Sequence, residues 1–388
     1  MDYIKEMEYL KSQGMLRSIP QIDGRGKWIK EISQNENSTN NTKLLLNLSS
    51  NDYLGIINRE DLTNEFITYI TKTHPCFSSA SSRLLTGNSS AYNKLEALLC
   101  KIFNKEAALV FNSGYHANIG ILPALCKKDS LIIADKLVHA SIIDGIKLSG
   151  CKFERFKHND CNHLESIIKR EQDCYKSIFI VTESIFSMSG DRAPLKNLVM
   201  LKKRYPQIIL YVDEAHAFGV YGAEGLGLSE ECNILQDVDI LVATFGKAIS
   251  SIGAFVVCSG TIREYLVNKM RSFIFSTALP PINIEWSRFI IEKLSTFTAE
   301  RENLSAISKH MRDKMLCTIS SSHIVTYVTS EATVAVELSH KLKQNGFYAL
   351  PVRPPTVPQG ESGIRFSLTA AITKHEIDEV INTILKTI

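Results

Sequence analysis

The feature that most constrains the fold of this chain is the alternation, through its central part, of short apolar runs with longer segments of helical periodicity. This alternation is typical of βαβ units and of a largely parallel sheet. The runs predict strands at 107–111, 130–134, 177–182, 208–214, 239–244 and 253–258. The sequence therefore predicts one doubly wound α/β sheet, with helices that begin at Gly114 and near His139.

The pattern changes after residue 275, where "STALPP" interrupts the chain and long helical segments follow. Short strands are predicted there at 323–329 and 363–369. A chain of 388 residues also exceeds the roughly 250 to 300 residues at which a single core stops growing. We expect three segments: an N-terminal helix and loop (1–45), a large α/β domain (46–275) and a small C-terminal α+β domain (276–388).

Two local signals mark the ends of elements. Thr373 and Glu376 have the spacing of a capping box at the start of the last predicted helix. The segment "SQNENSTNNT" (33–42) is polar throughout and is predicted to be a mobile loop.

Composition excludes several classes of protein. The formal net charge of +3 has no long basic run behind it, so it gives no case for nucleic acid. No stretch approaches the ~18 consecutive apolar residues of a membrane span, and the N-terminus lacks the apolar core of a signal peptide. Nine cysteines without a C-x-x-C pair fit a reducing cytoplasm. The cluster "HNDCNH" (158–163) has no standard zinc spacing, so no metal is expected.

Lys247 stands alone in a run of small and apolar residues, "ATFGKAIS" (243–250), directly after a predicted strand. A phosphate-binding P-loop is excluded, because Leu241 replaces its first glycine and Ala248 its Ser/Thr. Two interpretations remain. The side chain of Lys247 extends to solvent from the start of a helix, or its amine is a nucleophile that forms a Schiff base with a carbonyl cofactor.

Polar residues also follow other predicted strands, at the edge where open α/β sheets bind ligands. Asp213 ends one strand and precedes His216 by three residues. Its carboxylate is either a cap or the partner of a pyridine nitrogen. Residues 113–115 start a helix, where backbone N–H groups bind phosphate. The ring of His139 either caps a helix or covers a flat cofactor.

Motifs spread along the chain carry a resemblance to a family. They are "LSSNDYLG" (48–55), "SSRLLTGN" (81–88), "FNSGYHAN" (111–118), "ESIFSMSGDRAPL" (183–195), "VDEAHAFGVYGAEGLG" (212–227), "TFGKA" (244–248), "FSTALPP" (275–281) and "RPPTVPQGESGIRFSLTAA" (353–371). From about Arg17 to the carboxyl terminus the sequence resembles the fold-type I pyridoxal-phosphate enzymes and, among them, the α-oxoamine synthases. The stretch "RPPTVPQG" looks like the biotin-pathway branch. Serines in "FGKAISSIG" replace glycines of relatives, which could change the mobility of the loop beside Lys247.

This resemblance implies an α/β fold-type I transferase with a mostly parallel, seven-stranded type of sheet, and pyridoxal 5′-phosphate (PLP) as cofactor. It implies that Lys247 holds the cofactor and acts as general base, that Asp213 pairs with the pyridine nitrogen, and that His139 stacks on the ring. The residues expected to contact the cofactor are Ser113, Gly114, Tyr115, His139, Ser187, Asp213, His216, Thr244, Lys247, Ser276 and Thr277. Ser276 and Thr277 would come from a neighbouring subunit, which implies a homodimer.

The resemblance also implies the substrates, L-alanine and a pimeloyl thioester carried by coenzyme A or acyl carrier protein. Arg353 would bind the amino-acid carboxylate, a task that suits a planar bidentate donor. Arg17, Asn51 and Thr356 would line the substrate side, although Arg17 could equally be a solvated helix residue. The alternatives are a glycine-using synthase such as 2-amino-3-ketobutyrate CoA ligase, a synthase of longer acyl chains, and a non-catalytic partner subunit.

Overall fold

The chain forms two compact units. The computed structural model describes residues 2–32, 43–315 and 319–387, so the predicted loop at 33–42 lies outside the described residues. Unit 1 comprises Met1–Arg59, Ser187–Asp191 and Ala299–Ile388, and unit 2 comprises Glu60–Phe186 and Arg192–Thr298.

These units have different bounds from the three segments expected at 1–45, 46–275 and 276–388. The physical reason is a strand pair between the two ends of the chain. Strand β12 (Phe347–Tyr348) pairs in parallel with β3 (Leu45–Asn47), so N-terminal and C-terminal residues share one sheet.

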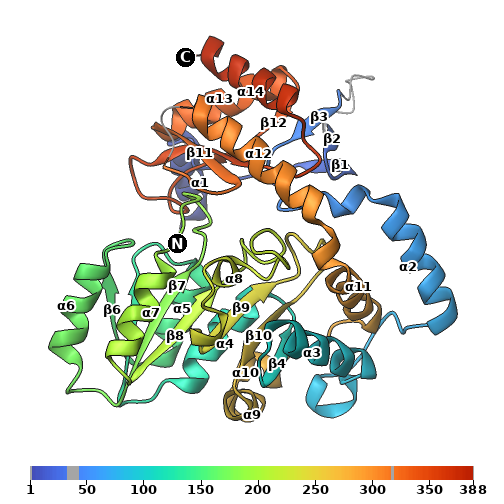
Figure 1. Cartoon of the computed structure of the whole chain (residues 1–388). Coiled ribbons are helices and arrows are strands. Elements are labelled where there is room, and N and C mark those ends of the chain that lie inside the picture. Colours follow the sequence, from blue (N-terminus) through green and yellow to red (C-terminus); the bar gives the residue numbers. More distant parts are fainter. Residues whose placement is uncertain (1, 33–42, 316–318, 388) are drawn as a thin grey trace. The chain divides into compact units, whose positions relative to one another are not determined.

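Unit 2 is built on a seven-stranded sheet (Figure 1). Its strands lie in the order β4 (Ala107–Phe111), β10 (Ala254–Cys258), β9 (Ile240–Thr244), β8 (Ile208–Asp213), β7 (Ser177–Glu183), β5 (Ser130–Asp135) and β6 (Lys152–Phe156). The pairs from β9 to β6 are parallel, whereas β10 is antiparallel to both β4 and β9. The six predicted strands and the largely parallel α/β sheet are confirmed.

The sequence analysis missed β6, "KFERF" (152–156). This strand lies at the edge of the sheet, and only Phe156 is fully buried in it. Because an edge strand is exposed along one side, it does not need the continuous apolar run by which the other strands were found.

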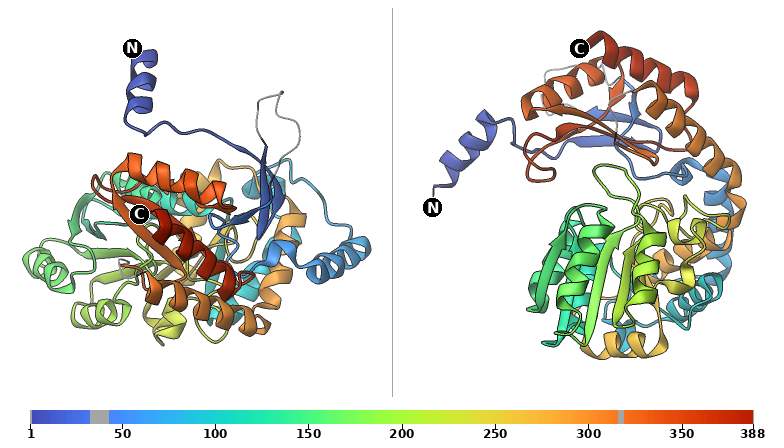
Figure 2. Two further views of the ribbon diagram at one scale, coloured as in Figure 1. Left: turned by 90° about the horizontal axis from the view of Figure 1, so that it is seen from above. Right: turned by 60° about the vertical axis from the view of Figure 1, so that its left-hand side comes forward.

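Helices cover both faces of this sheet (Figure 2). The helices of unit 2 are α2 (Glu60–Thr73), α3 (Ser90–Phe103), α4 (Gly114–Leu125), α5 (Ala140–Ser149), α6 (Cys161–Glu171), α7 (Leu195–Arg204), α8 (Leu228–Glu231), α9 (Gly260–Lys269), α10 (Arg271–Ile274) and α11 (Pro281–Glu292). Alternate strand residues, such as Ile132 and Ala134, pack against α4, α5, α9 and α10 in one buried cluster. Since side chains alternate across a strand, Tyr211 and Asp213 of β8 point to the same face.

Unit 1 contains two small sheets, β1-β2-β3-β12 and β11-β14-β13. Its further elements are α1 (Tyr3–Ser12), β1 (Gln21–Arg25), β2 (Trp28–Ile32), α12 (Thr298–Lys314), β11 (Ile324–Ser330), α13 (Ala332–Gln344), β13 (Pro351–Val352), β14 (Ser362–Ser367) and α14 (Lys374–Thr387). The two strands predicted near the C-terminus are β11 and β14. The capping box is also confirmed, because Glu376 Oε2 accepts from Thr373 N at 2.7 Å and Thr373 Oγ1 accepts from Glu376 N at 3.3 Å.

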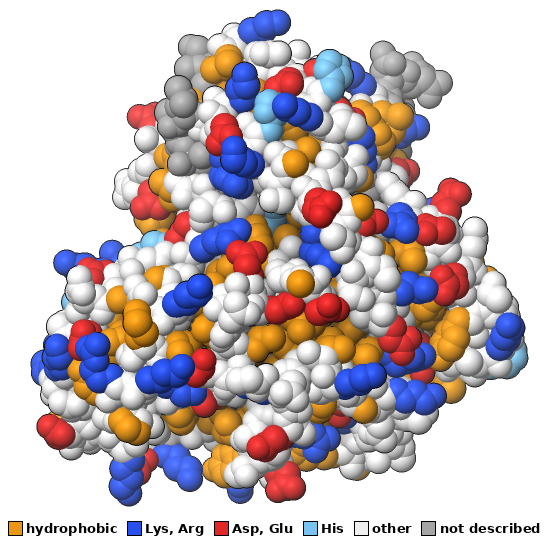
Figure 3. All heavy atoms as spheres, in the orientation of Figure 1, with side chains coloured by type: hydrophobic (Ala, Val, Ile, Leu, Met, Phe, Trp, Pro, Cys, Tyr) orange, Lys and Arg blue, Asp and Glu red, His pale blue; other side chains and the backbone are white. Residues whose placement is uncertain are grey.

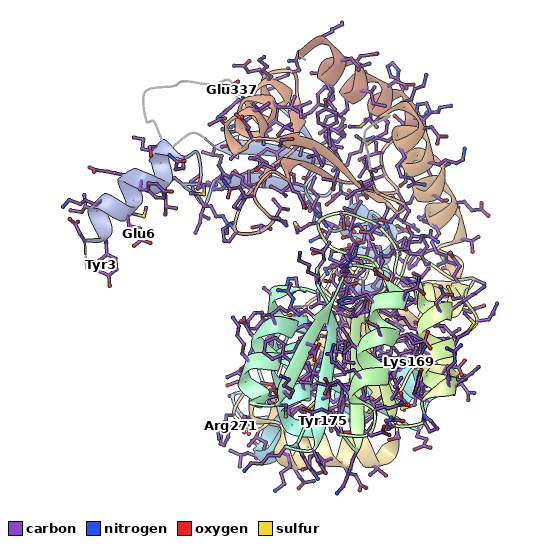
Figure 4. The ribbon with its side chains drawn as sticks, turned by 90° about the vertical axis from the view of Figure 1, so that its left-hand side faces the viewer. Tyr3, Glu6, Lys169, Tyr175, Arg271 and Glu337 are labelled. Carbon is purple, nitrogen blue, oxygen red and sulfur yellow. The ribbon has the colours of Figure 1, made fainter. Side chains whose placement is uncertain are left out.

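The surface carries charges of both signs. Lysine and arginine side chains are interspersed with aspartate and glutamate on the face in Figure 3, so the net charge of +3 does not gather into one field there. Helix α1 buries none of its residues, and its Tyr3 and Glu6 are labelled in Figure 4. No helix within the described ranges is long and apolar enough to cross a membrane.

Candidate active site

Lys247 lies just beyond the carboxyl end of β9. Its Nζ atom is 2.9 Å from Nε2 of His216, which follows β8 and is 5% exposed. The segment around Lys247 is not helical, so the interpretation of a lysine at a helix start is not supported. The neighbouring strands β8 and β9 are parallel, so their carboxyl ends meet at one edge of the sheet.

Asp213 occupies the same edge, at the end of β8, and is 5% exposed. Two N–H donors hold its carboxylate. Oδ1 accepts from the backbone of Ala215 at 2.9 Å, and Oδ2 accepts from Nδ2 of Asn118 at 2.8 Å. These contacts fix the position of the carboxylate at this edge, where it can pair with a cationic ring nitrogen.

His139 follows β5 and caps the N-terminus of α5. Its Nδ1 atom accepts from the backbone N–H of Ser141 at 3.2 Å and lies 2.7 Å from Ser141 Oγ. Burial against the protein lowers the pKa of His139, Asp213 opposes this shift, and the positive charge of Lys247 adds to it. The imidazole is therefore neutral at pH 7.

The N-terminus of α4 lies beyond the carboxyl end of β4. Ser113 caps this helix, because its Oγ accepts from His116 N at 3.2 Å. The first N–H groups of a helix, here those of Gly114 and Tyr115, have no partner within the helix and suit an anion. The hydroxyl of Tyr115 donates to Asp144 Oδ2 at 2.7 Å, and this hydrogen bond raises the pKa of Tyr115.

Gly114 leaves room in front of the helix. A Cβ atom built at residue 114 would meet only Thr244, at 3.9 Å from its Cβ. The hydroxyl of Thr244 donates to Gly253 O at 2.9 Å and accepts from Gly246 N at 3.1 Å. A phosphate that takes this hydroxyl therefore has to compete with Gly253 O.

Ser276 and Thr277 follow α10 in a segment that is tied to unit 2. Ser276 Oγ donates to Ser272 O at 2.6 Å. Thr277 forms a bridge with Ser82, and its carbonyl accepts from Asn112 Nδ2 at 2.7 Å. These contacts order the segment, while the expected role of its hydroxyls in a neighbouring subunit remains a prediction.

The expected substrate residues lie in unit 1. A cavity of about 440 Å³ is lined by Arg17, Arg353 and Thr356 among others. Arg17 Nη2 donates to Thr356 Oγ1 at 2.7 Å. The guanidinium of Arg353 donates to the carbonyls of Gly14 and Leu16, and burial and the charge of Arg17 lower the pKa of Arg353.

Two other predicted residues of unit 1 lie apart from this cavity's lining. Asn51 Oδ1 accepts from the Tyr53 hydroxyl at 3.0 Å. Ser187 belongs to the short segment Ser187–Asp191 of unit 1, and its carbonyl accepts from Arg365 Nε at 2.5 Å. The expected cofactor contact of Ser187 stays a prediction.

The polar cluster at 158–163 serves local structure. His158 Nδ1 lies 2.8 Å from Asp135 Oδ1, and His163 Nδ1 accepts from Lys157 N at 2.9 Å. Among the residues that the structure describes, no group of three or more His, Cys, Asp or Glu side chains is arranged to hold a metal ion.

Three buried residues at this edge were not predicted from the sequence to have a role: Asn118, Ser141 and Tyr211. Asn118 lay inside the motif "FNSGYHAN", and the period-2 alternation of β8 could have placed Tyr211 on the face of Asp213.

Glu214 is another buried residue that was not predicted from the sequence. Its carboxylate accepts from Leu228 N at 3.0 Å and from Ser229 N at 2.7 Å. Burial raises the pKa of Glu214, opposed by these hydrogen bonds. Glu214 thereby anchors the end of the glycine-rich loop that follows His216.

The donor set in unit 2 fits PLP. A lysine, a buried carboxylate, a neutral histidine and a helix N-terminus with space beside Gly114 lie at the carboxyl ends of β9, β8, β5 and β4. They match the aldehyde, the pyridinium nitrogen, the ring and the phosphate of this cofactor.

Comparison with other proteins agrees with this geometry. The family model described as aminotransferase class I and II matches residues 43–384. An 8-amino-7-oxononanoate synthase of Haemophilus ducreyi is 50% identical over 393 residues, covering 98% of this chain and 99% of that protein. A serine palmitoyltransferase from S. paucimobilis, solved with PLP and myriocin bound, superposes with a TM-score of 0.87 at 27% identity and covers 99% and 96% of the two chains. The 8-amino-7-oxononanoate synthase of Francisella tularensis gives 0.73 at 31% identity, covering 88% and 97%.

Fold and site thus define a PLP-dependent enzyme of the aminotransferase class I and II fold. The similarity extends over almost the whole length of both chains. The chain belongs to the 8-amino-7-oxononanoate synthase family and is an acyltransferase.

Proposed function

We propose that this enzyme condenses L-alanine with a pimeloyl thioester in biotin biosynthesis. A carbon–carbon bond forms between the alanine α-carbon and the thioester carbonyl carbon. The thiol and the alanine carboxylate leave, the latter as carbon dioxide, and 8-amino-7-oxononanoate remains. The observation that carries the proposal is the occurrence of Lys247, Asp213 and His139 at the carboxyl edge of one sheet, in a chain half identical to a relative of that name.

Each of these residues has a separate task. When bound, PLP supplies a ring that accepts electrons from the alanine α-carbon. Lys247 would take the proton from that carbon, since its amine lies at this edge of the sheet, 2.9 Å from His216 Nε2, and a neutral amine can act as a general base. Asp213 would stabilise the positive charge at the ring nitrogen, and the neutral His139 would cover the ring without adding charge. The first N–H groups of α4 would bind the phosphate.

We also propose a homodimer, which three strongly exposed apolar side chains of unit 2 support. Phe77, Leu85 and Phe275 are 77%, 79% and 71% exposed. The bridge between Ser82 and Thr277 holds two of these segments together. Large apolar side chains exposed on neighbouring segments are typical of protein interfaces. Cytoplasmic location remains part of the proposal.

Substrate choice is the finer part of the proposal. The alternatives within the family are glycine-using synthases, such as 2-amino-3-ketobutyrate CoA ligase, and enzymes that accept longer acyl chains. A non-catalytic partner subunit is disfavoured, because Lys247, Asp213 and His139 are all present.

The decisive experiment is identification of the product by mass spectrometry after incubation of the PLP-loaded protein with L-alanine and pimeloyl-CoA. A panel that crosses alanine, glycine and serine with several acyl thioesters, including pimeloyl-acyl carrier protein, separates the alternatives. A clear preference for glycine, or for acyl groups much longer than pimeloyl, would contradict the proposal.

A further inference from the structure

One buried amide connects the two residues that are expected to contact the cofactor ring, Asp213 at its nitrogen and His139 on its face. Asn118 is 2% exposed and lies one turn into α4. Its Nδ2 donates to Asp213 Oδ2 at 2.8 Å and to Ser141 Oγ at 3.0 Å, and its Oδ1 accepts from the Tyr211 hydroxyl at 2.5 Å. Three of the four hydrogen-bonding positions of the amide are therefore used.

The orientation of this amide follows from the charge of Asp213. If Asn118 were turned over, its carbonyl oxygen would face the carboxylate, and both atoms would be acceptors. The Tyr211 hydroxyl stabilises the orientation that the structure shows, because it donates a hydrogen bond to Asn118 Oδ1. Tyr211 is fully buried, and this burial together with the charge of Asp213 raises its pKa, so the hydroxyl keeps its proton.

The direction of the remaining hydrogen bonds then follows. Ser141 Oγ accepts from Asn118, so its own proton is available for Nδ1 of His139, 2.7 Å away. The backbone N–H of Ser141 points at the same nitrogen. Nδ1 is an acceptor in both contacts, which requires the tautomer with its proton on Nε2. The charged groups that act on this ring are Asp213, Lys247 and Asp144, and the ring stays neutral among them.

Close packing of two helices makes the network possible. Gly145 of α5 lies against α4, where an added Cβ would come within 2.3 Å of the backbone oxygen of Asn118. Ser141 precedes Gly145 by one helical turn, so it lies on the same side of α5. The absence of a side chain at 145 therefore lets Ser141 reach the Asn118 amide.

We propose that Asn118 is a positioning residue that fixes the Asp213 carboxylate and the His139 tautomer together, through one amide and the Ser141 hydroxyl. The proposal rests on the proposed function, because it assumes that Asp213 and His139 serve the same PLP ring. Losing Asn118 should release both groups, whereas losing the Ser141 hydroxyl should release only His139.

The test uses the full-length, PLP-loaded protein and two readouts other than activity. Imidazole ¹⁵N spectra, assigned with a His139→Gln variant, report which nitrogen of His139 carries the proton. The dissociation constant of PLP reports the Asp213 contact. Asn118→Ala should weaken PLP binding roughly 10- to 100-fold, the equivalent of one lost hydrogen bond to a charged group. It should also lower the Nε2–H fraction of His139, because only the backbone N–H of Ser141 then favours that tautomer.

Ser141→Ala tests the same network through a second residue, and it serves as the main variant if Asn118→Ala folds poorly. It should lower the Nε2–H fraction of His139, because the hydroxyl donor is lost and the backbone N–H remains. The PLP dissociation constant should stay within about threefold of wild type, because the Asn118–Asp213 contact remains. Tyr92→Phe is the matched control. It removes another buried hydroxyl of unit 2, which accepts from Leu279 N at 2.7 Å, and should change neither readout.

Two results would overturn the inference. One is a wild-type His139 with its proton on Nδ1, and the other is an Asn118→Ala protein that folds and binds PLP normally. A different result would contradict the proposed function alone. A protein that makes no product from alanine and pimeloyl-CoA but gives the expected spectra and PLP affinities would contradict that function and leave the role of Asn118 intact.

Discussion

The Nζ atom of Lys247 and the Nε2 atom of His216 lie 2.9 Å apart, although the two residues follow different strands of the sheet. Either nitrogen can be the donor of this hydrogen bond, since the role of Nε2 depends on the tautomer of His216. The contact holds the lysine at the edge of the sheet where Asp213 and His139 also lie. It makes Lys247 the residue by which the proposed chemistry is most directly tested.

Lys247→Ala should abolish turnover but still allow PLP to bind through the other contacts. Borohydride converts a Schiff base into a stable amine, so reduction of the wild-type protein should fix PLP to Lys247 alone. Peptide mass spectrometry checks the site of attachment. Lys169→Ala is the control, since Lys169 on α6 has a side chain that is 62% exposed (Figure 4). Labelling of a different lysine would refute the assignment.

Arg353→Lys should weaken the use of alanine. A lysine keeps the charge but cannot make two parallel hydrogen bonds to a carboxylate. Loss of one charge-assisted hydrogen bond costs about 1.5 to 3 kcal/mol, or roughly one to two orders of magnitude in kcat/KM for alanine. Steady-state kinetics and a separate PLP titration measure the effect. Since Arg353 also donates to the carbonyls of Gly14 and Leu16, a loss of thermal stability with unchanged alanine kinetics would assign it a structural role instead.

Mixing two inactive variants tests the shared dimer. Lys247→Ala removes the base, and Thr277→Asp places a negative charge where the phosphate of a neighbouring subunit is expected. In a heterodimer both defects fall in one site, so the other site is intact and activity should return to about half of wild type per dimer. Differently tagged chains and tandem purification isolate the heterodimer. Purified heterodimers without activity would argue against residues shared between subunits.

Gly145→Ala should destabilise unit 2. The new methyl group would lie 2.3 Å from the backbone oxygen of Asn118, and overpacking of this kind costs about 1 to 3 kcal/mol. In a domain of this size, Tm should fall by roughly 2 to 4 °C for each kcal/mol. Gly260→Ala is the control, because a methyl group there meets its nearest atom, Glu106 Oε2, at 3.6 Å. Equal Tm values for the two variants would contradict the close approach of α4 and α5.

The capping box of α14 should make stability depend on pH. Burial of Glu376 opposes its ionisation, but hydrogen bonds from Lys27 and Thr373 outweigh this effect and lower the pKa of Glu376. The contribution of the charged Glu376 carboxylate to the stability of the fold is therefore complete above the ordinary glutamate pKa of about 4.3. It is lost as the pH falls through the lower pKa of Glu376 in the folded protein. Glu376→Gln should reduce Tm at pH 7 and have a progressively smaller effect below about pH 4.

Thermal unfolding across this pH range measures the difference. Glu379→Gln is the matched control, since Glu379 is 53% exposed and lies 3.7 Å from His375, and exposed pairs contribute little. A Tm difference for Glu376→Gln that stays constant down to the lowest pH would show that the carboxylate charge is not involved.

The sequence by itself determined the elements that depend on local patterns. Apolar runs in the sequence predict buried strands such as β5 and β8, and the Thr373–Glu376 capping box depends only on two residues three positions apart. The position of Lys247 after a strand, followed by the resemblance of its motif, likewise identified the cofactor. These features are encoded between near neighbours, because backbone periodicity and capping act over a few residues.

Only the tertiary structure decided how distant residues combine. The edge strand β6 lacks an apolar run, and the pairing of β3 with β12 assigns both ends of the chain to unit 1. Asn118 contacts Tyr211 and Asp213 across separations of 93 and 95 residues. Hydrogen bonds between residues so far apart in the sequence depend on how helices and strands pack and on the space left by Gly145. No periodic pattern in the sequence predicts either of these.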